Sequence, residues 1–138
     1  MTLKRGKLID YEDIPPHLKN EAQDIVENVL LLSQASSRPR LVHLCGMPGA
    51  GKSTYAASFV KDHAGYNLVQ FDTVMEQLCG YRRDCAATNL PDAFKSWEWP
   101  ARAIGYYLLQ TLLENKRDIL FDHSATARSH LDLIDRVK

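Results

Sequence analysis

The segment LVHLCGMPGAGKSTYAASFV, residues 41–60, constrains the fold of this chain more than any other. A short apolar run is joined to a helix-forming stretch through three glycines, which are followed by a lysine and two hydroxyl side chains. Gly46, Gly51, Lys52 and Ser53 satisfy the spacing G-x-x-x-x-G-K-[ST]. Glycine allows positive φ and lets backbone N–H groups surround a phosphate. The segment therefore predicts a buried strand, a phosphate-binding loop and a helix.

The residue types in this loop suit a nucleoside triphosphate with Mg²⁺. A helix beginning near Gly51 adds unpaired N–H groups and the positive end of its dipole. Lys52 can reach the β- and γ-phosphates, and the Ser53 hydroxyl can ligate Mg²⁺. ATPases, GTPases, switches and kinases share such a loop, so the reaction stays open. The predicted ATP-binding residues are Gly46, Met47, Pro48, Gly49, Ala50, Gly51, Lys52, Ser53 and Thr54.

Composition limits the other binding functions. Seventeen basic and seventeen acidic side chains cancel, so there is no bulk field to attract nucleic acid or an anionic membrane. The cysteines Cys45, Cys79 and Cys85 are odd in number and lack C-x-x-C spacing, which favours neither a disulfide framework nor a zinc site. Residues 1–13 lack the apolar stretch of a secretory signal. We therefore expect a cytoplasmic protein that does not span or bind a membrane.

Apolar spacing and breaker residues predict helices alternating with three strands. Pro15 and Pro16 favour the start of the first helix, which carries apolar residues through Leu32, and Pro100 begins or kinks a later one. Residues 33–40 are predicted to be a linker and residues 81–92 an exposed loop. The predicted strands are 41–45, 66–72 and 117–124, and the predicted helices are 15–32, 51–65, 73–80, 101–112 and 127–138.

Alternating strands and helices predict βαβ units, a parallel sheet and right-handed crossovers. Parallel nucleotide-binding sheets usually have about five or six strands, and only three can be counted here. We therefore expect the N-terminal part of a larger domain. Residues 1–40 would form an N-terminal helix and linker, and residues 41–138 the core.

Two aspartates end predicted strands, at the edge where open parallel sheets bind ligands. Asp72 is a candidate general base for a substrate hydroxyl, and the alternative is that it only caps the next helix. Asp122, after the apolar ILF, suits the acidic residue that holds a metal ion, against an ordinary strand-end aspartate. His123 is more readily explained as structural than catalytic.

Several large side chains are candidates for phosphate or substrate contacts. Arginines could clamp phosphate oxygens, whereas a solvated role is the alternative for each. The tryptophans could stack on a sugar or base, but packing is the simpler explanation. The N-terminal amphipathic helix is a packing element or a partner-binding helix. The candidates are Arg82, Arg83, Arg102, Arg128, Trp97 and Trp99.

GMPGAGKST, a strand ending in Asp72 and ILFDHSATAR together resemble the P-loop kinases that include polynucleotide 5′-hydroxyl kinases and zeta-toxin sugar-nucleotide kinases. The resemblance covers about residues 40–138. It implies an α/β fold, a P-loop NTPase-type three-layer sandwich with a parallel sheet, here incomplete because the C-terminal strands and lid are missing. It also implies transfer of phosphate from ATP to a hydroxyl, with Lys52 on the phosphates, Ser53 on Mg²⁺ and Asp72 as base. Asp122 matches the acidic third-strand position, and Arg128 matches an arginine just after it.

The sequence leaves three functions open. The chain is an ATP- and Mg²⁺-dependent kinase acting on a small molecule, sugar nucleotide or nucleic acid end, in which case nucleic acid is a partner only as substrate. Alternatively it is a nucleotide-dependent switch or ATPase, with water as phosphate acceptor. The third possibility is a truncated kinase lobe that binds nucleotide without catalysis.

Overall fold

The computed structural model describes residues 11–44, 51–87 and 90–122 of the 138-residue chain. Its sheet has three parallel strands in the order β1-β3-β2. The bounds are Leu41–Leu44 for β1, Tyr66–Gln70 for β2 and Asp118–Asp122 for β3. These strands confirm the prediction of a parallel sheet, although β2 ends two residues earlier than expected.

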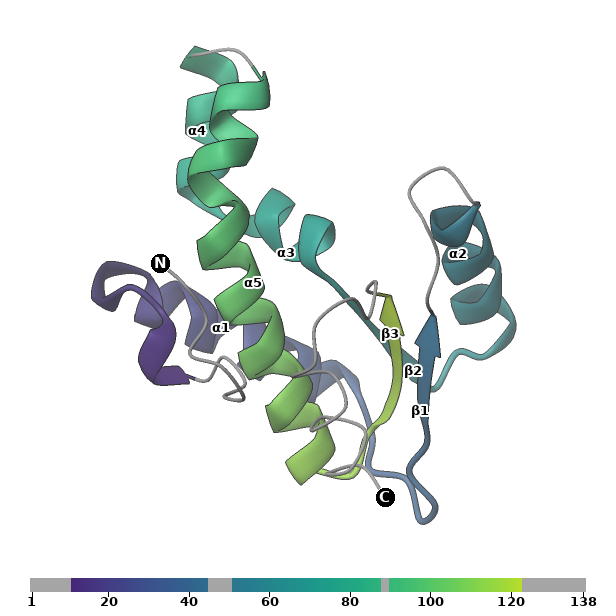
Figure 1. Ribbon diagram of the computed structural model, residues 1–138. Coiled ribbons are helices and arrows are strands. Elements are labelled where there is room, and N and C mark those ends of the chain that lie inside the picture. Colours follow the sequence, from purple (N-terminus) through teal and green to yellow (C-terminus); the bar gives the residue numbers. More distant parts are fainter. Residues whose placement is uncertain (1–10, 45–50, 88–89, 123–138) are drawn as a thin grey trace, which may run out of the picture.

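Helices cover both faces of this sheet. Helix α2, Lys52–Asp62, lies on one face, and α5, Leu90–Glu114, covers the other with α1, Lys19–Leu32, packed against it (Figure 1). The predicted helix at residues 127–138 lies outside the described residues. The described part of the chain thus forms a three-layer α/β structure, as predicted.

The core lies between the sheet and α5. Ile119, Leu120 and Phe121 of the central strand are fully buried. On α5 the predicted apolar face is confirmed, because its four residues are buried; these are Ala101, Ile104, Leu108 and Leu112. β1, expected to be a buried strand, is only half-buried, since it pairs on one side alone in the described sheet.

Residues 81–92 do not form the expected loop. Helix α3, Phe71–Gln77, is followed by α4, Cys79–Ala87, and α5 already begins at Leu90. Gly80, expected to stop a helix, lies inside α4. A Cβ atom there would come within 2.3 Å of the Trp97 ring, so glycine allows α4 to pack closely on α5. The Trp97 Nε1–H also donates a hydrogen bond of 2.7 Å to Asp84 Oδ2.

Helix α5 also runs through Pro100 instead of beginning there. Proline removes one backbone N–H and costs a helix interior about 3 kcal/mol. Ala101, Ala103 and Ile104 immediately after it are fully buried, and burial of this face offsets that cost. Within the described residues, no helix has both the length and the apolar composition needed to cross a membrane.

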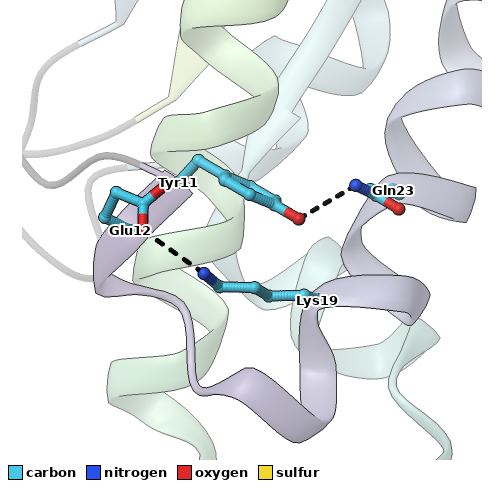
Figure 2. Close-up of polar contacts among 4 residues, drawn as sticks. All are labelled: Tyr11, Glu12, Lys19 and Gln23. Carbon is cyan, nitrogen blue, oxygen red and sulfur yellow. Dashed lines mark hydrogen bonds and ion pairs between the residues drawn. The ribbon is translucent and has the colours of Figure 1, made fainter.

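The N-terminal segment is a packing element. The 3₁₀ helices Tyr11–Asp13 (η1) and Pro16–Leu18 (η2) precede α1. In Figure 2, Gln23 Nε2 donates to Tyr11 Oη at 2.9 Å, and Lys19 Nζ lies 3.5 Å from Glu12 Oε2. These contacts hold η1 against α1.

Helix α1 buries its predicted face incompletely. Ala22 and Ile25 are buried as expected, whereas Leu32 is 91% exposed because it lies at the last residue of the helix. Glu21 of α1 accepts a hydrogen bond of 2.8 Å from the Cys79 backbone N–H. A carboxylate at the start of α4 satisfies an unpaired donor there, so α1 positions α4.

Candidate active site

The three strands end together at one edge of the sheet. In the register, Asp122 pairs with Leu44 of β1 on one side and with Gln70 of β2 on the other. The chain leaves Leu44 toward the glycine loop, and the N-terminus of α2 lies at the same edge (Figure 1). The end of β1, Asp122 and the start of α3, which carries Asp72, therefore belong to one edge of the sheet.

The glycine loop is described only at its end. Gly46–Ala50 lie outside the described residues, so their phosphate contacts stay a prediction. Gly51 is the N-cap of α2 and has φ +82°, which L side chains rarely adopt. Lys52 and Ser53 form the first turn of α2. The structure thus confirms the strand before the loop and the helix after it.

Asp122 is buried at the end of the central strand, with 6% of its surface exposed. Gln70 Nε2 donates a hydrogen bond of 2.5 Å to Asp122 Oδ2, and Thr73 Oγ1 donates one of 2.7 Å to Gln70 Oε1. This chain of bonds fixes the carboxylate from the β2 side. The sequence patterns did not predict the contact of Gln70 with Asp122, because it depends on the pairing of β2 with β3, whereas Thr73 reaches Gln70 locally, three residues along the chain.

One buried carboxylate suits an ion that is held mainly by phosphate and water. The described residues contain no group of three or more His, Cys, Asp or Glu side chains that could hold a metal. Asp122 is thus a candidate to hold Mg²⁺ together with the phosphates of a nucleotide, and the same role for the Ser53 hydroxyl stays a prediction from the sequence.

Asp72 is exposed and lies two residues after the end of β2, in the first turn of α3. The N-cap of α3 is Gln70, so the alternative interpretation of Asp72 as the helix cap is wrong. Asp72 instead lines a cavity of about 200 Å³ between α3, α4 and α5. Its other lining residues are Met75, Glu76, Tyr81 and Phe94. Tyr81 and Phe94 were not predicted here, because Tyr81 was expected in a loop and the helix that carries Phe94 was expected to begin only near Pro100.

Three of the candidate arginines are described, and each contacts a neighbouring protein group. Arg82 Nη2 donates to Cys79 Sγ at 3.3 Å, Arg83 Nε lies 3.7 Å from Asp84 Oδ1, and Arg102 Nη2 lies 2.9 Å from Glu98 Oε1. None of the three is among the described residues lining the Asp72 cavity. The candidates His123 and Arg128 lie outside the described part of the chain.

The two tryptophans pack rather than face the cavity. Trp97 and Trp99 are partly buried and pack against the core. The buried Nε1–H of Trp99 has no hydrogen-bond partner among the described residues. The structure therefore supports the packing explanation for both side chains.

Comparison with known proteins places this geometry in a family. No curated protein matches the sequence, but a solved chain from the PezAT chromosomal toxin–antitoxin system of the human pathogen Streptococcus pneumoniae is similar in structure. The TM-score is 0.68 at 16% identity, and the match covers 92% of this chain and 55% of that one. This chain therefore spans about half the length of its structural neighbour, and the likeness concerns the fold. Residues 41–137 match the family model described as "AAA domain", and the chain belongs to that family.

Proposed function

We propose that the protein is a P-loop kinase, an ATP-dependent phosphotransferase that moves the γ-phosphate to a hydroxyl group. The family supports nucleotide-dependent phosphotransfer or NTPase chemistry. The observation that carries the proposal is the register that pairs Asp122 with both Leu44 and Gln70. This register supports a site in which the phosphate loop, the buried carboxylate of Asp122 and the start of α3 share one edge of the sheet.

In this mechanism the loop amides and Lys52 bind the phosphates, and Arg128 clamps phosphate oxygens. Ser53 and Asp122 would hold Mg²⁺, which neutralises charge on the phosphates. Asp72 accepts the proton of the acceptor hydroxyl while the oxygen of that hydroxyl forms a bond to the γ-phosphorus. The bond from that phosphorus to the bridging oxygen breaks, and ADP leaves.

The contrast between the two carboxylates supports separate roles. A proton acceptor for a diffusing substrate must be reachable from solvent, and Asp72 is exposed. A carboxylate that positions a metal ion benefits from rigidity, and Asp122 is buried and hydrogen-bonded.

We further propose that residues 1–40 support the core formed by residues 41–138. Support comes from α1, which packs on α5, and from Glu21, which bonds to the start of α4. A cytoplasmic location is also proposed, because Cys79 and Cys85 are free thiols and ATP is the proposed donor.

The fate of the γ-phosphate tests the proposal. The complete gene product is incubated with Mg²⁺ and ATP, with and without a library of alcohols, and the products are followed by ³¹P NMR. We expect a phosphate monoester that appears only with an acceptor. Release of inorganic phosphate at a rate indifferent to every alcohol would instead identify an NTPase or switch. ATP binding with no turnover would identify a non-catalytic lobe.

A further inference from the structure

The cavity beside Asp72 has a composition of its own. Asp72 and Glu76 are four residues apart on α3 and so lie on one face of that helix. Tyr81 of α4 and Phe94 of α5 supply aromatic surface, and Phe94 is 42% exposed although it is large and apolar. Two carboxylates and two aromatic rings thus line one hollow of about 200 Å³.

The ionisation of Tyr81 agrees with this arrangement. The pKa of Tyr81 is raised, first by its hydrogen bond with Cys85, then by burial, and also by the negative charges of Glu76 and Asp72. Asp72 and Glu76 of α3 therefore act on a side chain of α4 that lines the same cavity.

Among the described residues, the cations next in sequence to the lining residues do not enter the hollow. Arg82, which follows Tyr81 directly, is bonded to Cys79 Sγ at 3.3 Å. Lys95, which follows Phe94, lines a separate hollow together with Glu98 and Arg102. The described lining residues therefore carry two negative charges and no positive one.

We propose that this cavity holds the phosphate acceptor and that the acceptor is a single hydroxyl-bearing ring with a protonated amine. The inference rests on the proposed kinase function. A cavity of about 150 Å³ can hold one benzene ring, so the present volume of about 200 Å³ accommodates a single ring. A hydroxyl lies at Asp72, the amine lies at Glu76, and an aromatic face offers a further cation–π contact.

This assignment narrows the acceptor class. Anionic acceptors, including nucleic acid ends and sugar nucleotides, would bring like charge to Asp72 and Glu76. A small amino sugar or a comparable cyclic amino alcohol satisfies the carboxylates and the ring-sized volume together. Glu76 is then a specificity-determining residue, while Asp72 acts on the reacting hydroxyl.

The test uses three acceptors with the same ring and different charge, namely glucosamine, N-acetylglucosamine and glucuronate, with the complete gene product at low ionic strength. We expect kcat/KM for glucosamine to exceed that for glucuronate at least about tenfold. Glu76→Gln should remove most of this preference, whereas the matched control Glu27→Gln, on the exposed surface of α1, should keep it.

Each outcome bears on the inference separately from the kinase proposal. Transfer with the same charge preference in Glu76→Gln and Glu27→Gln would overturn the inference while leaving the kinase intact. If no alcohol is phosphorylated, the kinase proposal fails. Calorimetric binding of the three sugars then decides whether the cavity binds a cationic ring. Tighter binding of glucosamine that Glu76→Gln weakens supports a cationic ring site, and equal or absent binding overturns it.

Discussion

The two carboxylates at the carboxyl edge of the sheet lie in opposite surroundings. Asp122 follows Ile119, Leu120 and Phe121, which are fully buried, and its own surface is 6% exposed. Asp72 is exposed on a short helix beside Phe94, which is 42% exposed. The strand side of the site, β3 with Asp122, is therefore enclosed by the core. The helical side, α3 and α4 with Asp72, presents Asp72 and Glu76 to solvent while α3 buries Val74 and Met75. Such a division would let a common phosphate site serve different acceptors.

The largest expected loss of stability comes from a substitution in β3, on the strand side. Phe121→Ala removes a fully buried ring that contacts His43 at a centroid distance of 5.0 Å and Tyr106 at 6.2 Å. We expect the free energy of unfolding to fall by about 3–5 kcal/mol, measured by urea denaturation. Phe94→Ala is the matched variant on the helical side and should cost less than about 1 kcal/mol. Equal losses of unfolding free energy in the two variants would contradict the contrast between a buried strand side and an exposed helical side.

The second prediction concerns Tyr106, a residue of α5 whose ring packs against Phe121 of β3. Burial raises the pKa of Tyr106 to about 12 from 10.0, against a smaller opposite effect of Arg102. Because the folded protein keeps this proton where the unfolded chain loses it, the stabilisation is complete below pH 10 and is lost as pH rises to 12. We expect the loss to be about 2–3 kcal/mol between these limits.

Urea denaturation at pH 9 to 12 measures this loss against Tyr106→Phe. The phenylalanine variant lacks the titrating group, so its stability should fall less over the window. Parallel curves for the two proteins would show that Tyr106 does not carry the effect.

A third substitution weakens the packing of α4 on α5, on the helical side. In Gly80→Ala the new Cβ would lie 2.3 Å from the Trp97 ring, so α4 must shift from α5. We expect unfolding to become easier by about 1–3 kcal/mol and the KM of the acceptor to rise, because Tyr81 moves with α4. Gly65→Ala is the control, since a Cβ there meets nothing within 4 Å. If Gly80→Ala keeps the wild-type KM for the acceptor, α4 does not contribute to the acceptor site.

The smallest effect lies on the outer surface of α5. Glu98 and Arg102 form an ion pair of 2.9 Å, with both side chains more than 40% exposed. Glu98→Gln should change the free energy of unfolding by less than about 0.5 kcal/mol, because solvent and salt screen such pairs. A loss above about 1 kcal/mol at moderate salt would show that this surface contributes more than its exposure indicates.

Sequence patterns predicted the strand side better than the helical side. Residues 119–121 form a continuous apolar run directly after Asp118, and such runs report burial directly. The order β1-β3-β2 was not predicted, because no local pattern states which strands become neighbours. The bond from Gln70 to Asp122 depends on that order and could not be predicted either.

Helix α4 illustrates why the helical side was harder. Its residues Cys79–Ala87 include no buried side chain, so no apolar period marks it. Its position depends on distant partners, namely Glu21 at its start and Trp97 against Gly80. Because Tyr81 lies on this helix, the cavity beside Asp72 could not be assembled from the sequence.

Activity of Asp72→Asn is the most direct test of the division between the two sides. Phosphate transfer and ATP affinity are measured in this variant and in Asp24→Asn, whose aspartate is exposed on α1. We predict that Asp72→Asn loses at least about 10²-fold in kcat, as expected for removal of a general base, and keeps its ATP affinity within about twofold. Transfer at the rate of Asp24→Asn, or a matching loss of ATP affinity, would contradict the placement of Asp72 on the acceptor side.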